Sequence, residues 1–142
     1  MGCSHLIRIV SWQDEAPVLR IIRTTVFIRE QQIPEDLEWD EFDLISMHVL
    51  ALSSDGQPIG TARLLPSGYI GRMAVLKEWR GKGFGSAMLQ RILEELRNRG
   101  MQKAMLNAQT IAIKFYEKFG FQVYGEEFIE AGIPHVKMIL QW

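Results

Sequence analysis

Residues 73–86 of the chain read MAVLKEWRGKGFGS, and the interpretation of the whole sequence depends on this stretch. An apolar, strand-like run is followed by a basic turn with three glycines, and an amphipathic pattern begins directly after it. Glycine admits positive φ angles and lets a ligand approach the backbone closely. A helix that begins there presents unpaired N–H groups and the positive end of its dipole. The stretch therefore predicts a strand, an anion-binding loop suited to a pyrophosphate, and a helix.

The spacing of the glycines separates this loop from two common phosphate-binding motifs. A P-loop requires G-x-x-x-x-G-K-[ST], which does not occur, and the dinucleotide motif G-x-G-x-x-G would need a glycine where Ser86 stands. The pattern that fits is Arg-x-x-Gly-x-Gly, formed by Arg80, Gly83 and Gly85. It resembles the acetyl-CoA-binding motif of the GNAT N-acetyltransferase superfamily. A plain glycine turn between a strand and a helix is the alternative.

The resemblance implies that acetyl-CoA is the co-substrate. In the family, the loop amides hold the pyrophosphate of CoA, and the strand before the loop pairs with the pantetheine arm. The implied contacts on the strand of this chain are Met73, Ala74 and Val75. Those on the loop and the helix start are Arg80, Gly81, Lys82, Gly83, Phe84, Gly85 and Ser86.

A second segment, residues 112–121 with the sequence AIKFYEKFGF, resembles the family's A-x-x-F-Y-E-K-x-G-F ending. The resemblance implies that Tyr116 lies beside the sulfur of CoA and protonates the departing thiolate. A phenol suits this step because the pKa values of phenols and thiols lie within roughly two units of each other. Phe115 and Phe119 are interpreted as packing residues, and packing is also the alternative role for Tyr116.

Position 109 departs from the family pattern. Many members carry an asparagine there, seven residues before the tyrosine, and it bonds the pantetheine; this chain has Gln109. Glutamine offers the same amide on a longer arm, and Asn107 is close enough in sequence to share the task. Both residues are therefore expected to contact the cofactor.

The resemblance covers most of the chain. Residues 26–32 (VFIREQQ) and 126–138 (EEFIEAGIPHVKM) resemble the ElaA/YjcF-like bacterial branch, whose substrates are poorly defined. Residues 26–27, the acidic run after them and Gly60-x-x-Arg63-Leu64 are also similar to acyl-homoserine-lactone synthases. Two alternatives to N-acetyl transfer therefore stay open: an acyltransferase like those synthases, and a CoA-binding sensor without turnover.

Periodicity and the resemblance together predict one α/β domain over residues 1–142. A mixed, largely antiparallel central sheet is flanked by helices, in the order β-α-β-β-β-α-β-α-β-β. Strands are expected at residues 6–12, 47–52, 58–65, 69–76, 103–108, 121–124 and 136–140, and helices at residues 15–31, 85–99 and 111–119. Residues 33–43 are expected to form a loop, with or without a short helix. Pro17 is placed in the first turn of the first helix, where its missing N–H costs little.

Composition excludes several classes of protein. The chain has 142 residues with 16 Lys and Arg against 17 Asp and Glu, so a nucleic-acid-binding domain is disfavoured. Its single cysteine, Cys3, rules out an internal disulfide, and its three histidines lie too far apart for a zinc site, so no metal is expected. The absence of a signal-peptide core and of an apolar run of about 20 residues predicts a cytoplasmic protein without membrane contact. The sequence leaves open whether the chain forms a homodimer.

The resemblance implies direct transfer, in which an amine attacks the thioester carbonyl. A backbone amide between Met73 and Val75 would polarise that carbonyl as an oxyanion hole does. Cys3 is not expected to act as a nucleophile, because no base stands at a recognisable position. A primary alkylamine has a pKa of about 10.4, so a base must take its proton. The expected catalytic carboxylates are Glu30 and Glu38, and the further candidates for the base are Asp40 and His135.

A run of carboxylates surrounds these candidates. Seven acidic side chains fall between residues 30 and 43, with Trp39 and Phe42 among them. Such a cluster would attract a cationic acceptor, and its aromatic residues would form a pocket wall. The alternative is a solvated acidic loop. Arg72, next to the predicted cofactor strand, is expected either to contact the substrate or to pair with an acid.

Overall fold

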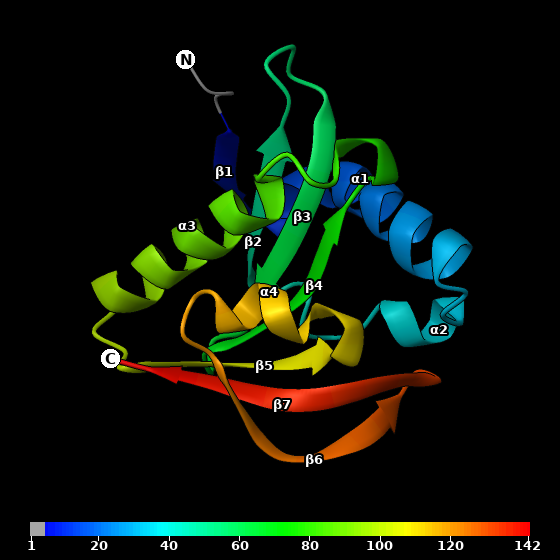
Figure 1. The fold of residues 1–142 in the computed structure, drawn as a ribbon. Coiled ribbons are helices and arrows are strands. Elements are labelled where there is room, and N and C mark those ends of the chain that lie inside the picture. Colours follow the sequence, from blue (N-terminus) through cyan, green and yellow to red (C-terminus); the bar gives the residue numbers. More distant parts are fainter. Residues whose placement is uncertain (1–4) are drawn as a thin grey trace.

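The computed structural model describes residues 5–142, which fold around a seven-stranded sheet (Figure 1). The strands lie in the order β1-β2-β3-β4-β5-β7-β6, and every neighbouring pair is antiparallel except β4 and β5. They are β1 Leu6–Val10, β2 Met47–Leu52, β3 Pro58–Leu64, β4 Tyr69–Val75, β5 Lys103–Gln109, β6 Gln122–Glu130 and β7 Ile133–Gln141. The predicted mixed, mostly antiparallel sheet is confirmed. The expectation for Cys3 falls outside the described residues.

Helices cover both faces of the sheet. The α-helices are α1 Trp12–Arg23, α2 Glu35–Glu38, α3 Phe84–Asn98 and α4 Ile113–Glu117; a π-helix, η1, spans Thr24–Glu30, and η2 Lys77–Trp79 and η3 Thr110–Ala112 are 3-10 turns. α1 packs against β2–β4 on one face, and α3 packs against the opposite face of these strands and of β5 (Figure 1). Two apolar layers therefore enclose the sheet.

α3 follows its predicted amphipathic pattern. Its buried side chains are Phe84, Met88, Leu89, Ile92, Leu93 and Leu96. Burying an aliphatic or aromatic side chain of this size contributes about 1.5–3 kcal/mol. Gly100, with a φ angle of +78°, follows the end of the helix as expected for a C-terminal cap.

The first helix begins earlier than its sequence pattern predicted. Ser11 accepts a hydrogen bond from the amide of Asp14 (3.1 Å) and thereby caps α1. Pro17 is then the sixth residue of the helix, so its predicted place in the first turn was wrong. The helix continues as η1, where the amide of Gln31 donates to the carbonyl of Val26 (3.0 Å). This π-type widening is not visible in a 3.6-residue periodicity.

The C-terminal hairpin is longer than predicted. β6 and β7 replace the expected strands 121–124 and 136–140, and they turn at Ala131-Gly132, which have φ angles of +53° and +78°. β6 is an exposed edge strand, so it lacks the alternation of apolar and polar residues by which a half-buried strand is recognised. His135, which precedes the expected last strand 136–140 by one residue, therefore lies within β7 opposite Gln109.

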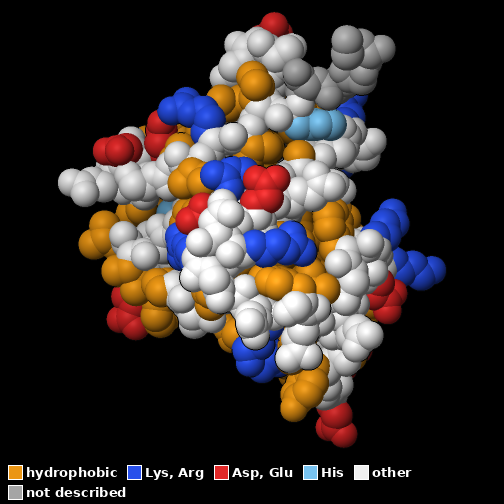
Figure 2. Space-filling view, turned by 90° about the vertical axis from the view of Figure 1, so that its left-hand side faces the viewer, with side chains coloured by type: hydrophobic (Ala, Val, Ile, Leu, Met, Phe, Trp, Pro, Cys, Tyr) orange, Lys and Arg blue, Asp and Glu red, His pale blue; other side chains and the backbone are white. Residues whose placement is uncertain are grey.

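The surface carries charges of both signs. On the face where α3 ends and β1 forms the sheet edge, basic and acidic side chains are interspersed with hydrophobic ones (Figure 2). This mixture agrees with the formal net charge of −1. No helix among residues 5–142 is both long and apolar enough to cross a membrane.

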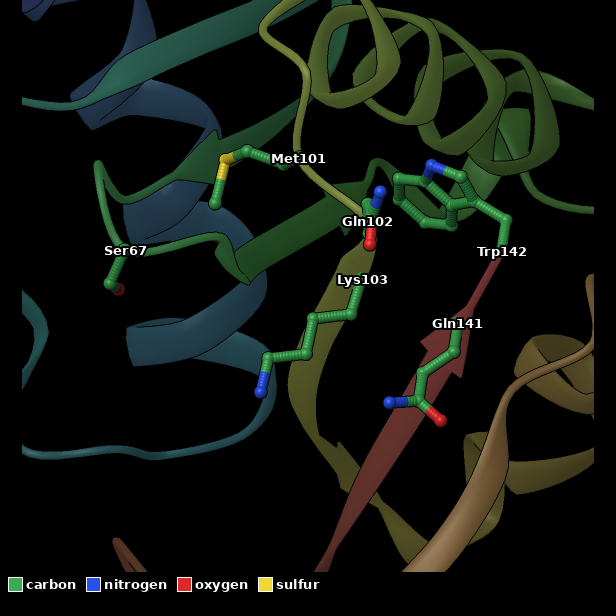
Figure 3. Close-up of a pocket in the computed structure, with 6 residues that line it drawn as sticks. All are labelled: Ser67, Met101, Gln102, Lys103, Gln141 and Trp142. Atoms are coloured by element: carbon green, nitrogen blue, oxygen red, sulfur yellow. The ribbon is translucent and has the colours of Figure 1, made fainter.

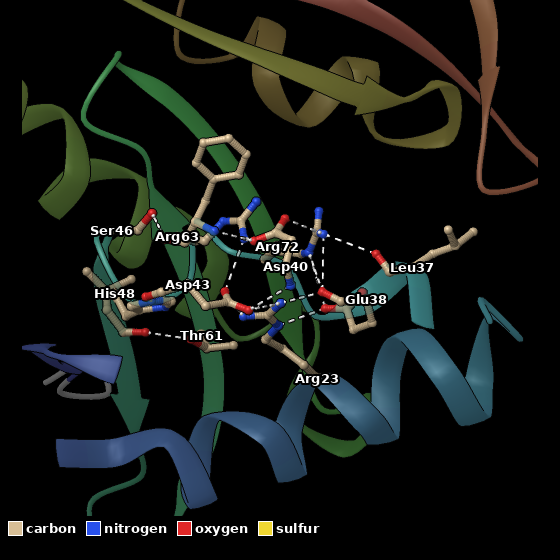
Figure 4. A network of polar contacts seen from close by, with 12 residues as sticks. Arg23, Leu37, Glu38, Asp40, Asp43, Ser46, His48, Thr61, Arg63 and Arg72 are labelled. Carbon is tan, nitrogen blue, oxygen red and sulfur yellow. Dashed lines mark hydrogen bonds and ion pairs between the residues drawn. The ribbon is translucent and has the colours of Figure 1, made fainter. Parts of the chain in front are cut away.

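A buried ion network fastens the acidic loop to the first helix and the sheet (Figure 4). Arg23, which is 0% exposed, donates from Nε to Glu38 (2.7 Å) and from Nη1 to Asp43 (2.6 Å). Arg63 donates to the same Asp43 oxygen (3.0 Å) and to Asp40 (2.7 Å). Burial alone would raise the pKa of Asp43, but the hydrogen bonds and charges of the two arginines lower it below its usual value. The carboxylates of the predicted loop thus hold it in place through ion pairs with Arg23 and Arg63.

Replacing Arg23 by methionine is expected to destabilise the fold strongly. The Arg23→Met change leaves Glu38 and Asp43 buried without their main partner, which costs about 3–5 kcal/mol of unfolding free energy. Protonation can neutralise such carboxylates, so the loss should be larger at about pH 8 than at about pH 5. Urea unfolding monitored by circular dichroism measures it. Arg99→Met, which removes a surface pair with Glu95, is the matched control and should cost less than about 1 kcal/mol. Equal losses in the two variants would contradict the role given to Arg23.

Candidate functional site

The parallel strands β4 and β5 separate partway along their length. They pair only where residues 69–70 face residues 105–106, although β4 continues to Val75 and β5 to Gln109. Beyond the pairing, backbone N–H and C=O groups on the facing edges have no partner in the other strand, and a ligand can satisfy them. An extended chain with its own amides binds such an edge by adding to the sheet. The pantetheine arm that the sequence resemblance implied is an extended chain of this kind.

A bulge bends β4 at this point. Between Gly71 and Ala74, β4 has one residue more than the facing stretch of β3 from Thr61 to Arg63. An extra residue bends the bulged strand and increases its twist. Arg72 lies in the bulge with a φ angle of +51°, a left-handed conformation that costs a non-glycine residue of order 1 kcal/mol or more.

The side chain of Arg72 anchors this bulge to the acidic loop (Figure 4). Its Nη2 donates to the carbonyl oxygen of Glu38 (3.2 Å) and to Asp40 Oδ2 (3.2 Å). Its Nε lies 3.3 Å from the carboxylate of Glu38. Of the two roles expected for Arg72, the structure gives it the pairing with acidic side chains. The buried network around Arg23 therefore extends to the strand that borders the site.

The loop after β4 has the geometry of an anion site. Gly81 and Gly83 have φ angles of +75° and +90°, values that favour glycine, and Gly83 is the N-cap of α3. No side chain of the described residues caps this end, so the first amides of α3 are available to a ligand. The His5 ring donates from Nε2 to the carbonyl oxygen of Lys82 (2.6 Å). A Cβ added at Gly83 would lie 3.0 Å from the same ring nitrogen. The first turn of α3 is formed by Phe84, Gly85 and Ser86.

Two predicted site residues, Arg80 and Glu30, are paired with each other. The guanidinium makes two hydrogen bonds to the carboxylate (2.6 and 2.7 Å), and its Nε donates to the carbonyl of Val75 (2.9 Å). The hydrogen bond from Arg80 lowers the pKa of Glu30, and the same bond raises the pKa of Arg80. Because their side chains are 40% and 39% exposed, a phosphate can still approach the pair. The pair ties the end of η1 to the glycine loop.

Tyr116 points from α4 toward β4. Its hydroxyl donates to the sulfur of Met73 (3.8 Å). Its ring packs edge-on against the rings of Phe115 and Phe121, with ring centres 5.0 and 5.9 Å apart. Burial raises the pKa of Tyr116 to about 12, so the phenol keeps its proton throughout the neutral range. The structure thus brings a protonated phenol to the β4 residue at which the bulge ends.

The amide of Gln109 lies on the other strand of the separation. It donates to the side chain of Gln31 (2.9 Å) and accepts from it (3.3 Å), so the two amides pair reciprocally. Asn107, two residues earlier on β5, is exposed. Gln31 was not among the predicted site residues, although it belongs to residues 26–32, which resembled the ElaA/YjcF-like branch. Membership of that segment is the signal in the sequence that points to Gln31.

The remaining candidates for the base lie in different surroundings. Burial raises the pKa of Glu38, which is 2% exposed and surrounded by arginines. Asp40 is paired with Arg63 and Arg72. Trp39, expected in a pocket wall, covers the guanidinium of Arg23 instead, with 5.0 Å between that group and the ring centre.

His135 lies on β7 beside the end of β5. Its Nδ1 donates to the carbonyl of Ile133 (2.7 Å), which leaves Nε2 as the acceptor of the ring. This Nε2 lies 3.9 Å from the carboxylate of Glu130. The ring of Phe128 stacks on the imidazole, with centres 6.0 Å apart. His135 is thus the candidate base whose lone pair is not engaged by an arginine.

A separate depression of about 510 Å³ lies at the opposite end of β5 (Figure 3). It is lined by Ser67, Met101, Gln102, Lys103, Gln141 and Trp142. None of the predicted site residues is among them, and the start and end of β5 are about 20 Å apart. The candidate site is therefore the separation of β4 and β5, where the glycine loop, Tyr116 and Gln109 converge.

Several known proteins are similar to this chain in sequence and in fold. Residues 21–142 match the family model described as acetyltransferase (GNAT) domain. The uncharacterized N-acetyltransferase YjcF of Bacillus subtilis is 36% identical over 122 residues, covering 83% of this chain and 86% of that protein. ElaA of Escherichia coli is 31% identical, covering 91% of this chain and 95% of that protein. The crystal structure of an acyl-CoA N-acyltransferase from Pseudomonas aeruginosa has a TM-score of 0.84 at 30% identity, covering 96% of this chain and 99% of that chain.

These matches confirm the resemblance inferred from residues 73–86 and 112–121, including its ElaA/YjcF-like branch. They extend over both strands that border the separation and over the glycine loop between β4 and α3. The chain belongs to the GNAT acetyltransferase family, whose members use acetyl-CoA as the acyl donor.

Proposed function

We propose that the chain moves an acetyl group from acetyl-CoA directly to a primary amine of a small molecule or peptide. The observation that carries this proposal is the separation of β4 and β5 beside the glycine loop at the start of α3. The loop amides and the dipole of α3 suit a pyrophosphate. The unpaired strand edges suit the amides of a pantetheine arm. A nucleotide alone would use the loop but has no extended amide chain to fill the separation.

In the proposed reaction, the amine nitrogen forms a bond to the acetyl carbonyl carbon and the C–S bond of the thioester breaks. A backbone N–H of β4 between Met73 and Val75 stabilises the negative charge that develops on the carbonyl oxygen. Tyr116 gives its proton to the departing thiolate. Burial keeps this phenol protonated at neutral pH but also makes it a weaker acid than a free phenol, so the transfer is uphill to a thiolate whose ordinary pKa is about 8.5. The proton lost by the nitrogen on forming the amide returns to the tyrosine through solvent.

His135 is the group proposed to take the first proton from the acceptor ammonium, because its Nε2 is the acceptor of the ring and no arginine of the described residues is paired with it. Glu30 and Glu38 act in this proposal through the arginines that they hold. Glu30 positions Arg80 at the glycine loop, and Glu38 positions Arg72 at the bulge. Neither carboxylate then needs to exchange protons with the substrate.

Tyr116→Phe is expected to lower kcat more than it lowers the affinity for acetyl-CoA. The change removes the proton donor while keeping the ring contacts with Phe115 and Phe121, so kcat should fall about 100-fold. The acetyl-CoA dissociation constant should change less than about threefold, because the hydroxyl contributes one weak contact to sulfur. Thiol release and calorimetry measure the two quantities. Equal losses would indicate packing, and acetyl-CoA binding without thiol release on any amine would indicate a sensor.

Gly83→Val is expected to abolish acetyl-CoA binding and leave the protein folded. A valine at a φ angle of +90° is strained, and its Cβ would displace the His5 ring from the loop. Gly56→Val is the matched control, because Gly56 has a similar φ angle of +82° but open space around its Cβ. Calorimetry should show no binding at high micromolar acetyl-CoA for Gly83→Val and normal binding for the control. Unfolding of the Gly83 variant alone would support a purely structural turn.

A further inference from the structure

The acidic loop does not offer the negative surface that its composition suggested. Three of its carboxylates are paired with arginines in the buried network, and Glu30 is paired with Arg80. The attraction of a cationic acceptor by this loop would therefore rest on the remaining acidic residues alone, which are Glu35, Asp36 and Glu41. The charge preferred in the acceptor must be inferred from other groups at the strand separation.

Lys137 is a cation with no carboxylate within ion-pair distance among residues 5–142. It lies on β7 opposite Tyr124 of β6, and its Nζ is 5.7 Å from the centre of that ring. The same Nζ is 5.6 Å from the ring centre of Tyr69 on β4, across the intervening strand β5. Two aromatic rings thus flank the ammonium group. The Tyr69 hydroxyl raises the pKa of Lys137, so the group is charged at neutral pH.

This ammonium lies where β4 and β5 begin to separate. Tyr69 belongs to the paired stretch of β4, whereas Asn107, the β5 residue opposite Lys137, is the first beyond the pairing. Residues opposite each other on neighbouring strands share a face, as do residues two apart on one strand. Gln109 and His135 therefore lie on the same face as Lys137. This face is turned away from α3, against which the alternate residues of β5 are buried.

We propose, on the basis of the acetyl transfer proposed above, that Lys137 binds a carboxylate of the acceptor. The substrate class is then small amines that also carry a carboxylate, such as α-amino acids. A lysine ammonium with no carboxylate partner among residues 5–142 can form a charge-assisted hydrogen bond with a carboxylate of the substrate. On this face, the guanidinium of Arg72 is already engaged by Glu38 and Asp40.

The neighbouring groups suit the amine end of the same molecule. His135, the proposed acceptor of the amine proton, lies two residues from Lys137 on the same face of β7. The exposed carboxylate of Glu130, 3.9 Å from His135 Nε2, supplies a negative charge beside it. A molecule with both an ammonium and a carboxylate therefore meets a complementary charge at each end.

The test compares amino acids with their primary amides as acceptors, using the full-length protein, acetyl-CoA and a thiol-release assay. The primary amide of an amino acid lacks the carboxylate charge but keeps the amine. Because that amine is less basic, more of it is unprotonated at neutral pH, so chemical reactivity alone favours the primary amide over the amino acid. We expect kcat/KM to be about tenfold or more higher for the preferred amino acid than for its amide, mainly through KM. Lys137→Met should reduce this ratio to about one or below, whereas Lys137→Arg should keep it.

Lys103→Met is the matched control, since Lys103 lies at the far end of β5 and should leave the ratio unchanged. A ratio near one in the wild-type protein, or a preference that survives in Lys137→Met, would overturn the carboxylate assignment. Failure to acetylate either member of every pair, while other amines are acetylated, would also overturn it and leave acetyl transfer standing. Absence of acetyl-CoA binding by calorimetry would instead overturn the proposed function, and this inference with it.

Discussion

The buried guanidinium of Arg23 is the interaction on which the candidate site depends. Because it is fully excluded from solvent, its partners Glu38 and Asp43 must come to it, and they bring the loop between η1 and β2 with them. Separating such a buried pair would leave an uncompensated charge, so the loop has one favoured position. Glu38 in turn holds Arg72, and Arg72 anchors the bulge in β4. The separation of β4 from β5 is thus connected to an ion network on the α1 side of the sheet.

In the proposed reaction, the two reactants approach the separation from different sides of the sheet. The glycine loop and the start of α3 lie on the side suited to an anionic donor. Lys137 and His135 lie on the opposite face, where the acceptor would enter. Tyr116 reaches β4 between them. A net charge of −1 conceals this arrangement, because most of the acidic loop is neutralised internally while Lys77, Lys82 and Lys137 lack such partners among the described residues.

The features that could be predicted from sequence are local ones. The glycine turn between a strand and a helix, the 3.6-residue pattern of α3 and the succession of helices and strands along the chain depend on near neighbours in the sequence, and all three were predicted correctly. The features that were missed depend on distant partners. The true length of β6 and β7 is set by pairing across the hairpin, and the π-helix η1 has no distinctive pattern. The pairs formed by Arg80 with Glu30 and by Gln109 with Gln31 join residues far apart in the sequence.

By itself, the sequence determined the family, the glycine loop before α3 and the tyrosine that the structure places against β4, because those are specified by short motifs with fixed spacing. Only the tertiary structure decided which charges are available to a substrate. From the sequence alone a carboxylate is a possible base or a charge that attracts a cation, but its role changes once an arginine from another element of the fold pairs with it. Lys137 is the converse case. It lies within residues 126–138, which resemble the ElaA/YjcF-like branch, but no motif assigns it a role, and it comes close to Tyr69 only because β4, β5 and β7 lie side by side.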